Sequence, residues 1–329
     1  MDFMQELMRG GLWILPAAMM IDGFLGDPEG FYHPVVTVGK IISRMENGIR
    51  KLHIKRFGGL VLVITILFFV FFALRGLIEV SGRISPWLST AVMIYFTYAG
   101  LAGKCLEVEA LKVYDSLKRN GLSDARRKIG YLVGRETDRL DEEEIVKATV
   151  ETVAENTIDG ILAPVFYWFI GYLLGYPVEF LWLYKGINTL DSMVGYHQEP
   201  YRDIGYCPAK LDDLANFIPA RLGSLFMIAF GGRSHGERQD GFRVFLRDRK
   251  AHKSPNAGHP EAVAAGILGI QLGGSNVYFG GVVEKPTIGD DRAQGKPEHI
   301  LQALGIMRRS MWSFTMFLLM VTGFLVSSR

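Results

Sequence analysis

The chain alternates long uncharged apolar runs with segments that are dense in charge. Three of the runs are "GGLVLVITILFFVFFAL" (58–74), "ISPWLSTAVMIYFTYAGLAG" (84–103) and "MWSFTMFLLMVTGFLVSS" (311–328). Each is about the length needed to cross a hydrocarbon core of roughly 30 Å. One such run fits a buried helix of a soluble enzyme, but three indicate an integral membrane protein. A shorter run at 10–26 is followed by "GDPEG" and not by a cleavage site of small residues, so it is interpreted as a retained span.

The pattern between the runs predicts how the chain is organised. Spans at 58–78 and 84–103 form a hairpin with a short link at 79–84. Residues 104–160 have helical periodicity and predict a helical insert, with Ser123 capping one helix and Asp141 capping the next in a capping box with Glu144.

Residues 160–290 are apolar but irregular. Segments 160–176 and 178–190 are each short for a crossing and are separated by Gly175-Tyr176-Pro177, which predicts a re-entrant or interfacial hairpin. Residues 262–283 are rich in Gly and Ala, which suits close helix packing. We expect an all-α integral membrane protein that forms a single membrane-embedded domain over 1–329. It would combine several transmembrane helices, broken or re-entrant helices, a cytoplasmic helical insert at 104–160, a catalytic region at 160–290 and a C-terminal transmembrane helix at 311–328.

Composition and charge agree with a membrane protein and orient it. The chain is 49% hydrophobic, with 21 Phe and 13 Met, and its net charge is only +2. Lys and Arg are dense in 27–57, 104–160, 232–261 and 284–309, whereas 79–84 contains only Arg83. The positive-inside rule therefore predicts a multi-pass protein of the cell membrane whose polar segments face the cytoplasm. Cys105 and Cys207 stand alone, which favours reduced thiols over metal ligands.

An acidic stripe leads directly into apolar sequence at "ETVAENTIDGILAPVFYW" (151–168). Glu151, Glu155 and Asp159 are four residues apart and share one helix face. A charge run is usually a solvated face, but ionisable groups at lipid depth are expensive and usually functional. Glu155, Asn156 and Asp159 are therefore candidate site residues, while Glu151 is expected only to extend the face into water.

Four further polar clusters lie beside apolar sequence. They contain Asp22, Asp27 and His33; Lys185, Asn188 and Asp191; Asp212, Asp213, Asn216 and Arg221; and Asn256, Gly258 and His259. Carboxylate and amide oxygens suit Mg²⁺, which joins one or two carboxylates to substrate phosphates. The start of a helix after "SPNAGHPE" is suited to an anion, although no ordinary P-loop is present. These residues point to magnesium-dependent phosphoryl or phosphate-ester chemistry at a membrane surface, with no nucleic-acid partner.

Long motifs in the same order resemble the adenosylcobinamide-phosphate synthase family of cobalamin biosynthesis. They are "DGFLGDPEGFYHPVVTVGKII", "GRETDRLDEEEIVKATVETVAENTIDGILAPVFY", "KGINTLDSMVGYHQEPYRDIGYCPAKLDDLANFIPARL" and "SPNAGHPEAVAAGILGIQLGG", which extend from about residue 20 to 290. The resemblance implies a carbon–nitrogen ligase of the cytoplasmic membrane that uses ATP and Mg²⁺. Such an enzyme joins a propionate carboxylate of adenosylcobyric acid to the amine of aminopropanol phosphate or ethanolamine phosphate. Other late membrane enzymes of the pathway are expected partners.

The candidate residues fall in these motifs, and we assign their roles from chemistry. The catalytic candidates are Asp27, His33, Lys185, Asn188 and His259. The candidates for binding substrate or phosphate are Asn156, Tyr196, Arg202, Asn216, Arg221, Asn256 and Gly258. The candidates for Mg²⁺ are Glu155, Asp159, Asp191, Asp212 and Asp213. One departure stands in "GYHQEPY", where His197 and Pro200 replace the basic residues usual in the family, and this leaves the choice of amino-alcohol open.

Two other classes of protein remain as alternatives. A CDP-alcohol phosphotransferase or a prenyltransferase-like enzyme is also membrane-embedded and magnesium-dependent, and "DDLAN" resembles the aspartate motif of the latter. Neither explains His33-Pro34 or "SPNAGHPE". A corrinoid transporter or scaffold is the other alternative, but transporters commonly show internal repeats and none is visible in this sequence.

Overall fold

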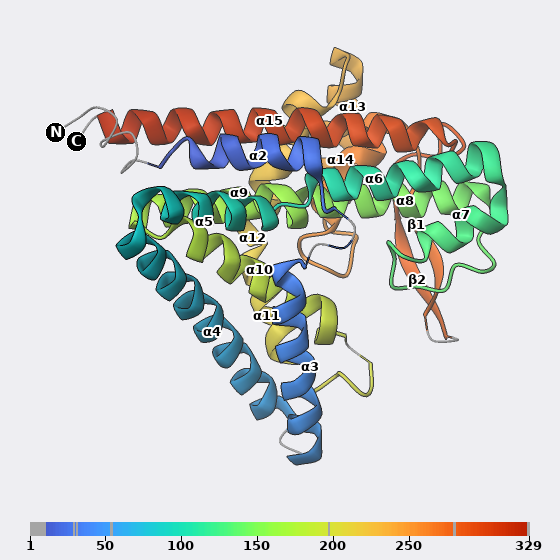
Figure 1. The fold of residues 1–329 in the computed structure, drawn as a ribbon. Coiled ribbons are helices and arrows are strands. Elements are labelled where there is room, and N and C mark those ends of the chain that lie inside the picture. Colours follow the sequence, from blue (N-terminus) through green and yellow to red (C-terminus); the bar gives the residue numbers. More distant parts are fainter. Residues whose placement is uncertain are drawn as a thin grey trace. The chain divides into compact units, whose positions relative to one another are not determined.

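The structure is a computed structural model that describes residues 11–28, 30, 32–52, 55–196, 198–278 and 281–327. His197, one of the two departures from the motif of the resembled family, lies outside these residues. The chain divides into two compact units (Figure 1). The first comprises Met1–Lys104, Ala163–Ala215 and Leu318–Arg329, and the second comprises Cys105–Leu162 and Asn216–Phe317. Each unit is described by itself.

The first unit is built from helices, most of which are apolar. They are α2 (Ile14–Leu25), α3 (Pro34–Leu52), α4 (Lys55–Ile84), α5 (Pro86–Ala99), α9 (Ala163–Leu174), α10 (Pro177–Val194), α11 (Tyr206–Ala215) and the end of α15 (Glu298–Ser327). Helix α10 packs against α9, α4, α11 and α3, while α2 packs against α5. The predicted break at Gly175-Tyr176-Pro177 is confirmed, because α9 ends at Leu174 and Pro177 begins α10.

The corner between α4 and α5 is sharper than the sequence suggested. Helix α4 continues through 79–84, the segment expected to form the link, and ends only at Ile84. The Ser85 hydroxyl then accepts a hydrogen bond from the backbone N–H of Trp87 at 3.2 Å, and Pro86 occupies the first helical position. Proline tolerates this position because its missing N–H has no partner there anyway.

The second unit contains shorter helices, three π-helical turns and a β-hairpin. The elements are α6 (Gly103–Asp115), η1 (Ser116–Asn120), α7 (Leu122–Ile129), α8 (Glu142–Thr157), η2 (Ile158–Leu162), α12 (Phe217–Phe226), η3 (Met227–Gly231), α13 (His235–Asp248), α14 (Gly258–Leu268), β1 (Leu272–Tyr278), β2 (Gly281–Ile288) and α15 as far as Phe317. The antiparallel hairpin, drawn in orange in Figure 1, was not predicted. Strand β1 and the first residues of β2 lie in the stretch 262–283, for which the sequence predicts close helix packing.

The two predicted helix caps had different outcomes. Asp141 and Glu144 form a complete capping box, since each side chain accepts a hydrogen bond from the other residue's backbone N–H at 2.8 Å. The prediction for Ser123 was wrong. Helix α7 already begins at Leu122 after Gly121, whose φ of 86° suits glycine, so Ser123 lies inside the helix.

The structure contains helices that are long and apolar enough to cross a membrane, as the prediction of a helical membrane protein requires. By length and composition, three helical stretches in the described part of the chain qualify: Lys55–Ile84, Pro86–Asn120 and Glu142–Leu174. The helices Tyr206–Ala215 and Phe217–Gly231 are bent by 41° relative to each other, and if this pair is one broken span the number of candidate spans is four. Two stretches extend into 104–160, the region expected to be a separate insert, and Glu142–Leu174 passes residue 160 without a break. Helix α15 is not among the three, so its crossing at 311–328 stays a prediction.

Candidate functional site

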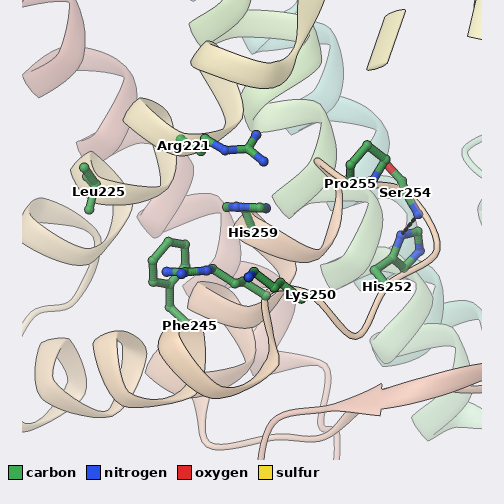
Figure 2. Close-up of a pocket in the computed structure, with 9 residues that line it drawn as sticks. Arg221, Leu225, Phe245, Lys250, His252, Ser254, Pro255 and His259 are labelled. Carbon is green, nitrogen blue, oxygen red and sulfur yellow. Dashed lines mark hydrogen bonds between the residues drawn. The ribbon is translucent and has the colours of Figure 1, made fainter. Parts of the chain in front are cut away.

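A cationic pocket of about 590 Å³ lies in the second unit. Its nine lining residues come from α12, from the end of α13, from the following loop and from the first turn of α14 (Figure 2): Arg221, Leu225, Phe245, Arg249, Lys250, His252, Ser254, Pro255 and His259. Three of them are cations and two are imidazoles, and none of these nine residues carries a carboxylate. The pocket is therefore suited to an anion.

Local hydrogen bonds shape the loop that borders this pocket. The Nδ1 atom of His252 accepts a hydrogen bond from the backbone N–H of Ser254 at 2.9 Å. The hydroxyl of Ser254 in turn accepts hydrogen bonds from the backbone N–H groups of Asn256 and Ala257, both at 3.2 Å. Side chains that bond to nearby backbone in this way stabilise turns and helix starts. They bring the loop to the start of α14.

Gly258 lets the loop close on α14. A Cβ atom at this position would lie 2.7 Å from the carbonyl oxygen of Arg249 and 2.8 Å from the Cβ atom of His252. Real Cβ atoms do not approach backbone so closely, so a larger residue would push the loop away. The close approach at Gly258 is therefore to the chain's own loop.

Arg221 is held in place on the pocket wall. Its Nη1 atom donates to the carbonyl oxygen of Phe217 at 2.7 Å and to Oδ1 of Asn256 at 3.2 Å. The guanidinium also lies over the Phe217 ring, 3.5 Å from the centroid. The structure thus brings together Arg221, Asn256, Gly258 and His259, four residues that the sequence analysis took from two separate motifs.

His259 is the most buried imidazole of this pocket, with 5% of its surface exposed. Burial and the nearby cations Arg221, Arg249 and Lys250 lower the pKa of His259 from 6.5 to about 4, so its side chain is neutral at pH 7. Its Nδ1 atom is buried and has no hydrogen-bond partner among the residues that the structure describes. Figure 2 shows the ring between Arg221 and Lys250.

An acid–histidine pair lies in the first unit. The Nε2 atom of His33 is 4.0 Å from Oδ1 of Asp27, while its Nδ1 atom accepts a hydrogen bond from the backbone N–H of Val35 at 3.2 Å. Because Nδ1 accepts, the proton of the neutral ring is on Nε2, which has the backbone of Ala99 as its hydrogen-bond partner. Burial lowers the pKa of His33, and the nearby charge of Lys185 lowers it further, whereas Asp27 raises it. The structure therefore brings three predicted catalytic residues into one neighbourhood.

Asp22 adjoins this pair and was noticed in the sequence without being given a role. It is buried, with 4% of its surface exposed, and its Oδ2 atom accepts a hydrogen bond from the backbone N–H of Lys104 at 3.2 Å. The hydroxyl of Tyr98 donates to the carbonyl oxygen of Gly26, between Asp22 and Asp27 in the chain. These contacts fix the turn that carries Asp27.

The remaining candidates of the first unit lie on α10, on α11 and on the segment between them. Lys185, Asn188 and Asp191 are on α10, Asp212 and Asp213 are on α11, and Tyr196 and Arg202 lie between the two helices. Asp213 pairs with Lys210 at 3.1 Å. Asp213 and Asn216 do not lie on one helix, because α11 ends at Ala215 and Asn216 stands at the break before α12.

The acidic stripe belongs to the second unit and differs from the expectation at its first residue. Glu151 does not extend into water, because only 7% of its surface is exposed. Its carboxylate is 3.3 Å from Nη2 of Arg135 and accepts a hydrogen bond from the backbone N–H of Gly273 at 2.8 Å. Glu155 and Asn156 follow on α8 and Asp159 lies in the π-helical turn η2, all three half-buried. Such turns often occur at functional sites.

The proposed metal ligands fall in both units, and their chemistry fits magnesium. Asp191, Asp212 and Asp213 belong to the first unit, and Glu155 and Asp159 belong to the second. Within the ranges that the structure describes, no three or more His, Cys, Asp or Glu form a group that could hold a metal ion. Magnesium does not require such a group, since it binds through one or two carboxylates together with waters and substrate phosphates. Half-buried carboxylates are the hard oxygen donors that it prefers.

Three ionisable residues of the pocket were not predicted from the sequence. Arg249, Lys250 and His252 line the pocket but lay outside the chosen motifs. A signal was present in "RDRKAHK" (247–253), the basic run directly before "SPNAGHPE". A basic run is usually a solvated face, and nothing local reveals which of its side chains converge.

Apolar helices long enough to cross a membrane and a built anion pocket define a helical membrane protein that is equipped to bind an anionic ligand. The chain belongs to the CobD/Cbib protein family, whose family model matches residues 15–307. The resemblance found in the sequence is thereby confirmed, and with it the prediction that the chain is an enzyme of cobalamin biosynthesis, of the adenosylcobinamide-phosphate synthase family.

Similar proteins from several bacteria cover most of this chain. Cobalamin biosynthesis protein CobD of Clostridium tetani is 46% identical over 285 residues, which is 85% of this chain and 88% of that protein. The protein of the same name from Listeria monocytogenes serotype 4b is 43% identical over 300 residues, or 88% and 92% of the two chains. That of Photorhabdus laumondii is 42% identical over 280 residues, or 84% and 86%. No solved structure matches the chain.

Proposed function

We propose that the protein is an ATP- and Mg²⁺-dependent amide ligase. It joins the amine of aminopropanol phosphate or ethanolamine phosphate to a propionate carboxylate of adenosylcobyric acid, which gives adenosylcobinamide phosphate. Family membership supports the pathway. The observation that carries the chemistry is the pocket lined by Arg221, Arg249 and Lys250, which is suited to the phosphate that the product retains.

Amide formation from a carboxylate needs an activated acyl group, because hydroxide or oxide is a poor leaving group at neutral pH. Transfer of a phosphoryl group from ATP to the propionate would give an acyl phosphate, which the amine then attacks to release phosphate. The protein's main contribution to phosphoryl transfer is to position the reactants and to stabilise developing charge. The lysine and arginine side chains near the candidate residues can supply that stabilisation.

The amine must lose its proton before it can attack. The carboxylate of Asp27 is the candidate to accept it, and His33 is the residue beside that carboxylate, with its Nε2 atom 4.0 Å from Oδ1 of Asp27. Lys185 lies close enough to influence the charge of His33 and is the candidate to hold an anionic group in the first unit. Asn188, one turn further along α10, can donate a hydrogen bond from its amide.

Mg²⁺ would bind through carboxylates among Asp191, Asp212, Asp213, Glu155 and Asp159. When bound, it would neutralise charge on the phosphate oxygens of ATP. Tyr196, Arg202 and Asn216 are polar residues of the same motifs that can contact the amino-alcohol or the corrin side chains. We expect the corrin to dock at a cytoplasmic mouth of a protein in the cell membrane, since three of the four long motifs overlap segments dense in Lys and Arg.

The test is amide formation by the purified protein. With adenosylcobyric acid, aminopropanol phosphate, ATP and Mg²⁺, we expect adenosylcobinamide phosphate and one equivalent of spent nucleotide. Glu155→Ala and Asp213→Ala should abolish turnover while the protein still accumulates in membranes. Near-normal turnover of both variants would rule out their metal assignment. Corrinoid uptake into vesicles without nucleotide use would favour a transporter, and product formation from a CDP-alcohol would favour the phosphotransferase.

A further inference from the structure

We propose that the pocket between α12, α13 and α14 binds the amino-alcohol phosphate itself, a phosphomonoester with an amino group, and binds it without a divalent cation. This assignment rests on the proposed function and names the substrate that this pocket takes. The phosphate of the ligand would contact Arg221, Arg249 and Lys250, and its amino group would contact His259.

The charges of the pocket match a small dianion. Three cations line about 590 Å³ of space, and a phosphomonoester carries close to two negative charges at pH 7. Arg221 is already oriented by Asn256 and Phe217, so little side-chain freedom is lost when it binds. Charge-assisted hydrogen bonds to phosphate oxygens are about twice as strong as neutral ones.

The lining argues against a nucleotide with its metal. ATP is bound in most sites as its magnesium complex, in which carboxylate oxygens of the protein commonly hold the ion. None of the nine residues that line this pocket has a carboxylate. A phosphomonoester needs no metal, because side-chain cations alone can balance its charge.

His259 gives the pocket a place for the amino group. The imidazole lines the pocket, while its Nδ1 atom is buried and has no hydrogen-bond partner among the described residues. The ring is neutral at pH 7, so the nitrogen that faces the pocket can accept a hydrogen bond when the proton of the ring is on the buried nitrogen. The N–H of an amine two or three carbons from the phosphate is the partner that the ligand supplies.

The binding experiment uses the full-length protein in detergent with a chelator present. Isothermal titration calorimetry measures the dissociation constant of each probe. Ethanolamine phosphate is the probe, and ethyl phosphate is the matched probe that lacks the amine. We expect ethanolamine phosphate to bind without metal and about fivefold more tightly than ethyl phosphate. Lys250→Ala should weaken binding about tenfold. Lys253→Ala should leave it unchanged, since Lys253 is an exposed lysine of the same loop that does not line the pocket.

His259 is tested by ligand preference, which loss of packing alone would not change. In His259→Leu the two probes should bind equally, whereas His259→Gln, which keeps a hydrogen-bond acceptor, should retain a preference for the amine. The proposal is overturned if ethanolamine phosphate binds only with Mg²⁺, or if Lys250→Ala and Lys253→Ala bind it alike. Displacement of the probe by ATP would also overturn it. Amide formation without binding at this pocket would reject the pocket assignment and leave the ligase function standing.

Discussion

The Oε1 atom of Glu151 accepts a hydrogen bond from the backbone N–H of Gly273 at 2.8 Å, while Oε2 lies 3.3 Å from Nη2 of Arg135. One carboxylate thus connects α8, the loop before it and the base of the β-hairpin. Gly273 itself has a φ of 82°, and a Cβ atom there would lie 2.3 Å from the carbonyl oxygen of Pro286. The hairpin is therefore fixed at its base by a glycine turn and by a buried acid.

Replacing Glu151 should destabilise the second unit strongly. Glu151→Ala leaves the Arg135 guanidinium, whose side chain is 6% exposed, without this carboxylate, and breaking a buried pair costs about 3 kcal/mol or more. We expect a decrease of roughly 6–12 °C in the unfolding temperature in detergent. Glu142→Ala, an exposed acid at the start of the same helix, is the control and should change it little. Equal unfolding temperatures for the two variants would contradict the role of Glu151.

His259 should make the protein less stable in acid. Its pKa is about 4 in the folded protein and 6.5 without these surroundings, so the unfolded chain binds more protons between these pH values. The contribution of neutral His259 to the free energy of unfolding is therefore complete above pH 6.5 and is lost as the pH falls toward about 4. At pH 5 the loss amounts to about 2 kcal/mol.

His259→Gln tests this contribution through the pH dependence of unfolding. The variant should lose about 2 kcal/mol less stability than the wild type between pH 7 and pH 5, whatever its stability at pH 7. His33 and His299, whose pKa values burial also lowers, are present in both proteins and cancel in the comparison. Parallel pH profiles for wild type and variant would show that His259 is not held neutral by its pocket.

The orientation of the chain can be tested at the start of α11. Tyr206 is 45% exposed, and a Tyr206→Cys substitution in a chain that carries Cys105→Ser and Cys207→Ser gives a single accessible thiol. A membrane-impermeant maleimide added to intact cells should leave it unlabelled, and labelling should appear after the membrane is opened. An Arg83→Cys control at the external corner should react in intact cells. Labelling of position 206 from outside would contradict a cytoplasmic site.

Local rules made part of the fold predictable. The apolar run at 58–74 lies within α4, the capping box of Asp141 and Glu144 begins α8, and Pro177 separates α9 from α10. Each of these features depends on residues within a few positions of one another. For the same reason, the motif before α14 correctly indicated a helix start.

Features that depend on distant partners were not predictable. Glu151 is separated by 16 residues from Arg135 and by 122 residues from Gly273, so its position in a helical stripe could not show that it is buried. The β-hairpin contains too many glycines to show a clear strand pattern, and it pairs only with itself. Arg249 and Lys250 line the pocket because the loop closes over Gly258, which the spacing of basic residues does not encode.

The most direct test of the ligase account follows the oxygen atoms of the propionate. Adenosylcobyric acid labelled with ¹⁸O in its carboxylates is incubated with the protein, ATP, Mg²⁺ and aminopropanol phosphate, and the phosphate products are examined by mass spectrometry. If a phosphoryl group activates the carboxylate, one ¹⁸O atom per amide formed must appear in inorganic phosphate. Corrinoid amide formed with no label in any phosphate or nucleotide product would contradict activation by ATP.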